Sequence, residues 1–230
     1  MRLAMYASDA LPPALQGQVR IHLCVYHSQF PLLLRSAIEQ QLDTLLNRRG
    51  TPASHDLALR RPALRVLIDA HPEPHHLFIV LGSPVTEVGR DHDYDYDWAV
   101  VEPSSMRSLI QLAGRVRRHR PGAVGGVNMV VLDSNLRHYE KPQKPAYEKP
   151  GFETAHAPFK LKSHHLHDLL GREVGEAKAW AVDAQPRIAL PADKLVRSRR
   201  WTDLEHARMH DSLLPKPQGT TTPTHAACLQ

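Results

Sequence analysis

The ten residues QLAGRVRRHR, positions 111–120, combine a glycine with a dense run of basic side chains. Five of the last six residues are basic, and four of these are arginine. On a predicted helix over 104–119, Gln111, Arg115 and Arg118 share one face, because their spacing matches the helical repeat. Like charges at this spacing repel each other. A phosphate-rich anion in front of that face would remove the repulsion and match the planar guanidinium groups.

Gly114 lies beside these side chains in the sequence and would let a ligand or another backbone approach closely. A nucleoside triphosphate is an anion that arginines contact in this way during phosphoryl transfer. The alternative is structural, because the helix dipole also favours arginines at a solvated helix C-terminus. The stretch alone leaves both interpretations open.

A second unusual stretch, residues 82–105, is rich in acidic side chains. Its carboxylates crowd one short segment before the next predicted strand: Glu87, Asp91, Asp93, Asp95 and Asp97. Their mutual repulsion calls for a counter-charge, which arginines or a metal ion would supply. Loops at the carboxyl ends of parallel strands are also where α/β proteins bind ligands. The structural alternative is a solvated acidic turn.

The elements that must position these residues alternate along the chain. Buried strands are predicted at 19–26, 75–83, 98–103 and 126–133. Helices are predicted at 62–71, at 104–119 with Ser104 or Ser105 as the cap, and between Ser28 and Gly50, where Ser28 would cap and Pro31 would lie in the first turn. This alternation predicts an α/β fold with a mainly parallel sheet flanked by helices.

The C-terminal part differs from the rest of the chain in amino-acid composition. Its prolines and lysines predict an extended surface linker over 138–160, and short helical patterns follow at 162–182 and 202–214. The segment LVRSRRW, 195–201, would bind single-stranded DNA through its arginines and Trp201, or Trp201 would pack the segment onto the rest of the protein. The last residues, 215–230, are predicted to be disordered.

Together, SPVTEVGRDHDYD and QLAGRVRRHR resemble motifs V and VI of superfamily 2 helicases, and VYHSQF at 25–30 resembles motif IV. The residues of these motifs most resemble those of the CRISPR-associated helicase-nuclease of type I systems, particularly subtype I-F. The resemblance implies a second RecA-like domain over 19–137, after a lead-in of 1–18. It further implies an accessory region over 161–214.

The resemblance assigns roles to single residues. Arg115, Arg118 and Gln111 would match the motif VI side chains that face ATP bound on another motor domain, next to Gly114. Gly89 and Asp91 would match the motif V residues that link nucleotide contacts to DNA contacts. The resemblance places the remaining matched residues against nucleic acid: Ser83, Glu87, His27 and Ser28. Gln29 departs from the arginine expected in motif IV, and Ser83 replaces the usual threonine but keeps a hydroxyl.

Several motifs of the complete helicase do not occur in this sequence. It has neither a phosphate-binding G-x-x-x-x-G-K-[ST] loop nor an acidic DExH-type motif. The resemblance therefore implies the C-terminal part of a longer enzyme, inactive alone, whose ATP and magnesium are held by a first RecA-like domain. The further partners implied are a nuclease domain of the same enzyme, single-stranded DNA and the CRISPR surveillance complex.

Composition sets broader limits. The 230 residues carry a net charge of +5, which favours an anionic partner such as nucleic acid or a nucleotide. The two cysteines, Cys24 and Cys228, form no CxxC pattern, and no apolar run is long enough to span a membrane, so a cytoplasmic location is expected.

Histidine–aspartate pairs occur four times, but their placement does not favour a nuclease metal site, and no metal is expected. His164, His165 and His167 also imitate a metal cluster, although a surface role is favoured.

Two functions from different classes fit the sequence. The first is the second motor domain of an ATP-driven DNA helicase, which supplies arginine side chains to an ATP site that it shares with another domain. The second is a stand-alone nucleic-acid-binding or regulatory module without catalysis. The basic charge and the absent phosphate loop favour the second function for the chain as it stands, whereas motifs V and VI favour the first.

Overall fold

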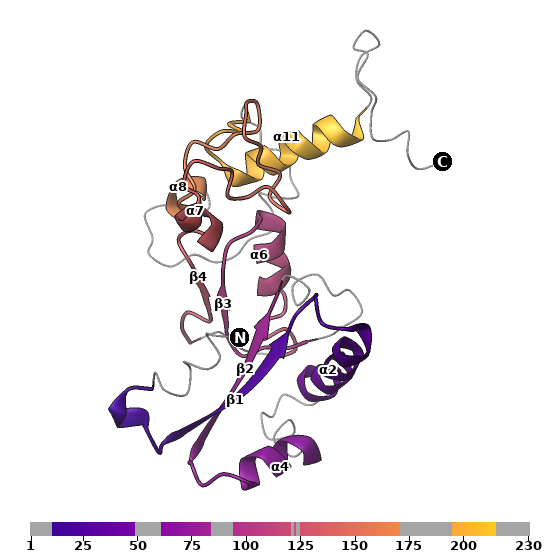
Figure 1. Ribbon diagram of the computed structural model, residues 1–230, viewed down its shortest axis with the longest axis vertical. Coiled ribbons are helices and arrows are strands. Elements are labelled where there is room, and N and C mark those ends of the chain that lie inside the picture. Colours follow the sequence, from indigo (N-terminus) through magenta and orange to yellow (C-terminus); the bar gives the residue numbers. More distant parts are fainter. Residues whose placement is uncertain are drawn as a thin grey trace. The chain divides into compact units, whose positions relative to one another are not determined.

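The computed structural model describes residues 11–48, 61–83, 94–120, 122, 125–170 and 195–214 (Figure 1). The chain divides into two compact units. Unit 1 comprises Met1–Asp97 and Gly114–Ala123, and unit 2 comprises Trp98–Ala113 and Val124–Gln230. The domain boundaries expected from the sequence come from the resemblance to helicases, whereas these units are defined by compactness. Those boundaries therefore stay predictions.

Unit 1 contains two long parallel strands. A 3-10 helix, η1 (Pro13–Leu15), precedes strand β1 (Val19–Tyr26), and helix α2 (Leu32–Leu46) follows it. Helix α4 (Pro62–Asp69) precedes strand β2 (His75–Gly82). The two strands pair from Val19 opposite His75 to Tyr26 opposite Gly82. Their carboxyl ends therefore lie side by side.

Helix α2 covers one face of this strand pair (Figure 1). Tyr26, Leu42 and Tyr94 are buried together, and Ile38 and Val80 pack against them. Ile38 and Leu42 lie one turn apart on α2, so both reach the sheet. Alternate residues of a strand point to one face, which brings the side chain of Tyr26 to the same side.

Among the described residues, unit 2 contains a shorter parallel pair of strands and several helices. Its elements, in chain order, are strand β3 (Ala99–Val101), helix α6 (Met106–Ala113), strand β4 (Met129–Val131) and helices α7 (Leu136–Glu140), α8 (Leu166–Leu169) and α11 (Trp201–Leu213). In the register of β3 and β4, Ala99 is opposite Met129 and Val101 is opposite Val131.

The core of unit 2 joins residues from distant parts of the sequence. Trp201 is fully buried, and its ring centroid lies 4.7 Å from that of Tyr147. Leu109 of α6 and Leu204 of α11 belong to the same core. Tyr147 and Phe159 come from the stretch expected to be a surface linker, so this stretch contributes side chains to the core.

The fold class expected from the sequence is confirmed, because parallel strands alternate with helices in both units. Within the described ranges the strands pair two by two. The capping of α6 is confirmed as well: the hydroxyl of Ser105 accepts a hydrogen bond from the backbone N–H of Ser108 at 3.0 Å.

Three local expectations were wrong. The helix expected over 104–119 ends at Ala113, directly before Gly114. The helix expected to start at Ser28 and stop at Gly50 is α2, whose N-cap is Pro31 and which ends at Leu46. Asn47 instead forms an antiparallel bridge with Tyr94, so tertiary pairing ends this helix early.

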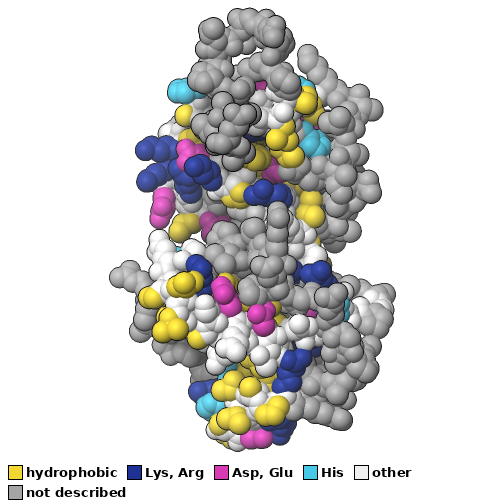
Figure 2. Space-filling view, turned by 90° about the vertical axis from the view of Figure 1, so that its right-hand side faces the viewer, with side chains coloured by type: hydrophobic (Ala, Val, Ile, Leu, Met, Phe, Trp, Pro, Cys, Tyr) yellow, Lys and Arg dark blue, Asp and Glu magenta, His cyan; other side chains and the backbone are white. Residues whose placement is uncertain are grey.

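The strands are also less buried than expected. Leu77 and Phe78 of β2 are exposed, as is Leu23 of β1. Figure 2 shows apolar side chains at the surface of the described part. A pair of strands gives each strand one neighbour among the described residues, so one edge and part of one face stay accessible.

Candidate functional site

The motif IV and motif V residues meet at the carboxyl ends of β1 and β2. The backbone N–H of Ser28 donates to the hydroxyl oxygen of Ser83 at 3.2 Å, and the N–H of Ser83 donates to the carbonyl of Tyr26 at 3.1 Å. The side chain of His27 stabilises the turn after β1, because its Nδ1 accepts a hydrogen bond from the backbone N–H of Gln29 at 3.1 Å. The structure thus brings together three of the four residues expected to contact nucleic acid: His27, Ser28 and Ser83.

The arginine segment, Gly114–Arg120, is irregular rather than helical. Its backbone pairs with Tyr96 instead: the N–H of Tyr96 donates to the carbonyl of Arg115 at 2.9 Å, and the N–H of Arg117 donates to the carbonyl of Tyr96 at 2.8 Å. Val116 and Tyr96 thereby form a parallel bridge. A sheet-like pairing at 115–117 is incompatible with a continuous helix, which explains the early end of α6.

This conformation changes the expected geometry of the three motif VI residues. Gln111 lies on α6 in unit 2 and is exposed, whereas Arg115 and Arg118 lie in unit 1. The shared helix face predicted for them was therefore wrong. Arg115 is only 8% exposed, while Arg118 is exposed to solvent.

The crowded carboxylates find their counter-charge in arginines. Asp95 is completely buried, and its Oδ1 lies 3.3 Å from a terminal nitrogen of Arg120. Arg120 also forms an ion pair with Asp97, whose other oxygen lies 3.9 Å from Arg48. The sequence left arginines and a metal ion open as the counter-charge, and arginines serve Asp95 and Asp97.

Sequence reasoning missed the tyrosines of this region. Tyr94 packs into the core of unit 1, and its ring centroid lies 6.0 Å from that of Tyr96. Burial raises the pKa of Tyr96 to about 12, and the nearby positive charge of Arg115 partly offsets that rise. The strict alternation in DYDYD could have indicated these packed tyrosines. A period of two places tyrosines on one side of an extended segment and aspartates on the other.

The remaining motif V residues, Glu87, Gly89 and Asp91, fall within 84–93, which lies outside the described residues. The same holds for the pairs His55–Asp56 and His92–Asp93 and for the tail predicted at 215–230. Their roles stay predictions.

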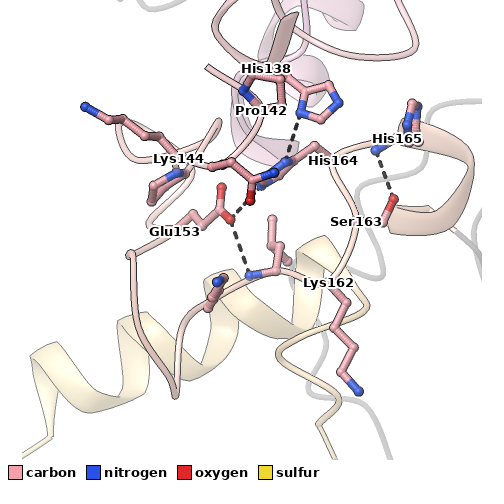
Figure 3. A pocket seen from close by; sticks show the side chains of 12 residues that line it. His138, Pro142, Lys144, Glu153, Lys162, Ser163, His164 and His165 are labelled. Atoms are coloured by element: carbon pink, nitrogen blue, oxygen red, sulfur yellow. Dashed lines mark hydrogen bonds and ion pairs between the residues drawn. The ribbon is translucent and has the colours of Figure 1, made fainter. Parts of the chain in front are cut away.

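Unit 2 has a cavity of about 330 Å³ beside α7 (Figure 3). The buried carboxylate of Glu153 lies at its wall and accepts hydrogen bonds from the backbone N–H groups of Ala146 and Tyr147, at 2.9 and 3.0 Å. His164 bonds the same carboxylate at 2.8 Å. Two lysines of the lining, Lys144 and Lys162, extend away from Glu153 on opposite sides (Figure 3).

The histidines beside this cavity have protein partners. Nδ1 of His164 lies 3.1 Å from Nδ1 of His138, and Nδ1 of His165 lies 2.6 Å from a carboxylate oxygen of Asp133. Within the described ranges, no group of three or more His, Cys, Asp or Glu side chains is arranged to hold a metal ion.

Trp201 follows the structural alternative, because it is buried beside Tyr147 and has no exposed ring face for a base. Two arginines instead approach the ring of Phe159: the guanidinium carbons of Arg197 and Arg208 lie 5.8 and 5.0 Å from its centroid. In the described part of the chain, no helix is both long and apolar enough to cross a membrane.

Comparison with known proteins gives one family and close relatives. Residues 4–121 match the family described as CRISPR-associated nuclease/helicase Cas3, C-terminal. A CRISPR-associated nuclease/helicase Cas3 of subtype I-F/YPEST from Pseudomonas aeruginosa is 54% identical over 196 residues, which are 85% of this chain and 17% of that protein. A protein of the same description from Pectobacterium atrosepticum is 42% identical over 197 residues, 84% of this chain and 17% of its own length. The chain thus spans about a sixth of the length of these curated relatives.

Proposed function

Because the chain belongs to the family of C-terminal regions of the CRISPR-associated nuclease/helicase Cas3, we propose that it is the C-terminal motor part of an ATP-dependent DNA helicase acting in CRISPR interference. The observation that carries the proposal is the placement of two motif groups in one compact unit. The contact between Ser28 and Ser83 lies in the same unit as Arg115 and Arg118.

The proposed chemistry of the arginines follows from charge. ATP and magnesium would be bound by another domain of the enzyme, because this sequence has no phosphate-binding loop. Arg118, which is exposed, would place its guanidinium against the phosphates and stabilise the negative charge that spreads over the transferred group. Arg115 would join it when the domains close. The nucleotide contacts expected of Gln111 and Gly114 stay predictions.

The proposed contacts to single-stranded DNA lie at the carboxyl ends of β1 and β2. His27, Ser28 and Ser83 offer an imidazole and hydroxyl groups there, which are groups that bind a phosphate backbone. Glu87, Gly89 and Asp91 would link these contacts to the nucleotide. The nuclease domain of the enzyme and the CRISPR surveillance complex are further proposed partners, in the cytoplasm.

ATP hydrolysis stimulated by single-stranded DNA tests the proposal. We measure it for the chain alone and after mixing with the N-terminal remainder of the Pseudomonas relative. We expect no turnover alone and turnover on mixing. Turnover by the chain alone would contradict the shared site, since it would require a phosphate-binding loop within this sequence.

Arginine variants then test the assigned roles. In the mixed system, Arg115→Ala and Arg118→Ala are expected to lower kcat by about 10³-fold, the size of an arginine-finger effect, with little change in DNA affinity. Arg65→Ala is the control, because Arg65 is an exposed α4 residue paired with Asp69. Unchanged turnover in both variants would refute the assignment. Salt-sensitive DNA binding without any effect of ATP or of the N-terminal remainder would instead indicate a stand-alone binding module.

A further inference from the structure

The arginine segment has a conformation that its own sequence does not favour. Arg117 has a φ of 55°, in the left-handed region that residues other than glycine rarely adopt. Four arginines within 115–120 also repel one another, since guanidinium groups are positively charged. Such a conformation persists only where the surrounding structure holds it. Contacts from outside the segment must therefore fix the backbone that carries Arg115 and Arg118.

Residues Tyr94–Asp97 supply those contacts from two sides. The backbone of Tyr96 bonds to Arg115 and Arg117, as described above. Asp95, the preceding residue, binds the other end of the segment: its Oδ2 accepts from the backbone N–H of His119 at 3.3 Å, and its Oδ1 forms the ion pair with Arg120. The two sequence neighbours of Arg118, Arg117 and His119, are thus both held by backbone hydrogen bonds.

Burial makes the charge of Asp95 important. The side chain of Asp95 is 0% exposed and that of Arg120 is 8% exposed. An ion pair at such a position contributes little by its mere presence, but removing one partner leaves the other charge buried and uncompensated. Asp97, whose side chain is 60% exposed, adds a second carboxylate to Arg120 at the surface. Without the charge of Asp95, Arg120 would keep only the carboxylate of Asp97, which lies at the surface. The segment would then rearrange to bring Arg120 to water, and Arg118 would move with it.

We propose that Asp95 and Arg120 are positioning residues, which hold the segment Gly114–Arg120 so that the guanidinium groups of Arg115 and Arg118 are presented in one fixed arrangement. Neither residue contacts the nucleotide in this proposal, and both act through the backbone of the segment. The inference rests on the proposed function, because a fixed arrangement matters for turnover only if these arginines face a phosphate.

The test uses Asp95→Asn in the mixed helicase system. Asparagine keeps the shape of the side chain and an oxygen for the N–H of His119, but it removes the charge that pairs with Arg120. We expect kcat for ATP hydrolysis to fall by about 10²-fold, the size of a small misplacement of a catalytic group, with KM for ATP nearly unchanged. Asp69→Asn is the matched control, since it removes an exposed ion pair with Arg65 in the same unit.

Combined variants separate positioning from a general loss of structure. If Asp95 acts through the two arginines, adding Asp95→Asn to the double variant Arg115→Ala/Arg118→Ala will lower kcat no further. Arg120→Lys should retain more turnover than Arg120→Gln, because lysine keeps the charge. Full turnover of Asp95→Asn, where Arg118→Ala is inactive, would overturn the positioning role alone. Full turnover of Arg115→Ala and Arg118→Ala would overturn the proposed function and this inference with it.

Amide hydrogen exchange separates a local effect of Asp95→Asn from a general destabilisation of unit 1, which would also lower activity. In the Asp95→Asn chain, the amide of Arg117, bonded to Tyr96, is expected to exchange faster. The amide of Ser83, bonded to Tyr26, lies in the same unit and should keep its rate. Equal acceleration at both amides would mean that unit 1 as a whole is destabilised, and it would overturn the local role of Asp95.

Discussion

Gly151 shows how closely the backbone approaches itself in unit 2. A Cβ atom at this position would lie 2.6 Å from the carbonyl oxygen of Tyr147 and 2.7 Å from that of Ser104. Both neighbours are backbone atoms, so they cannot turn aside as a side chain would. The position therefore requires glycine because of close approach, within a stretch whose prolines had suggested a surface linker.

We expect Gly151→Ala to lower the free energy of unfolding by about 1–3 kcal/mol, the usual cost of overpacking. Gly126→Ala is the control, because a Cβ there has no neighbour within 4 Å. Urea denaturation of both variants measures the difference. Equal stability of the two variants would contradict the close approach at Gly151.

Two histidines beside the cavity of unit 2, His138 and His165, have pKa values that are shifted in opposite directions. Burial lowers the pKa of His138 from the ordinary value of 6.5, and the neighbouring His164 and His165 lower it further. The hydrogen bond that the imidazole of His165 donates to the carboxylate of Asp133 raises the pKa of His165. The unfolded chain thus binds a proton at His138 more readily than the folded chain does. The contribution of neutral His138 to stability is present above pH 6.5 and is lost as the pH falls from 6.5 through the lowered pKa.

A side-chain NMR titration checks this order. As the pH falls from 8, His165 is expected to take up its proton before His138. Asp133→Asn should bring the pKa of His165 down towards 6.5, because the hydrogen bond to a charged acceptor is lost. Asp211→Asn, which removes a carboxylate of α11 paired with His210, should leave His165 unchanged. A pKa of His165 that does not respond to Asp133→Asn would refute this pairing in solution.

At the scale of elements, α6 and α11 depend on each other through one carboxylate. The backbone N–H of Met106, at the start of α6, donates to Oε1 of Glu205 at 2.7 Å, and both residues are fully buried. A helix leaves its first N–H groups without partners inside the helix, and a carboxylate there also complements the helix dipole. Glu205 of α11 thus shares the N-terminus of α6 with Ser105.

Glu205→Ala is expected to lower the free energy of unfolding by about 1–3 kcal/mol, because it leaves the buried N–H of Met106 without this acceptor. Glu205→Gln should cost less, since its amide oxygen still accepts. Glu140→Ala, an exposed α7 residue, serves as the control in the same thermal and urea experiments. A cost for Glu205→Ala no larger than that of Glu140→Ala would contradict the tertiary cap.

At the scale of the whole molecule, one apolar face of the β3–β4 pair is accessible. Ala99, Val101, Met129 and Val131 turn towards the core of unit 2, whereas Val100 and Val130, which are opposite each other, are exposed together with Trp98 and Leu132. Parallel sheets usually bury both faces. Since the chain spans about a sixth of the length of its relatives, we expect other parts of the complete protein to cover this face.

The isolated chain should therefore bind a hydrophobic dye such as ANS through this face. The double variant Val100→Thr/Val130→Thr is expected to lower dye fluorescence with little loss of stability, because threonine keeps the branched shape that strands favour. Val101→Thr, on the buried face, should instead lower the melting temperature. Unchanged fluorescence in the double variant would show that the dye binds elsewhere.

Local patterns in the sequence determined the elements and the chemistry on them. Apolar runs and helical patterns located β1, β2, α4 and α11, because such patterns depend on neighbours along the chain. The motif residues identified the family for the same reason: their spacing is short and their types are specific. The serine that caps α6 was also readable, since a cap acts over three residues.

Tertiary structure decided the features that depend on distant partners. Residues 114–119 left the expected helix because Tyr96 pairs with Val116, and Arg120, the next residue, has the buried Asp95 as counter-charge. Glu205 reached the start of α6 from 99 residues away. No local pattern encodes such contacts, because the free energy that selects them comes from burying charges and backbone groups with partners that only the folded chain brings near.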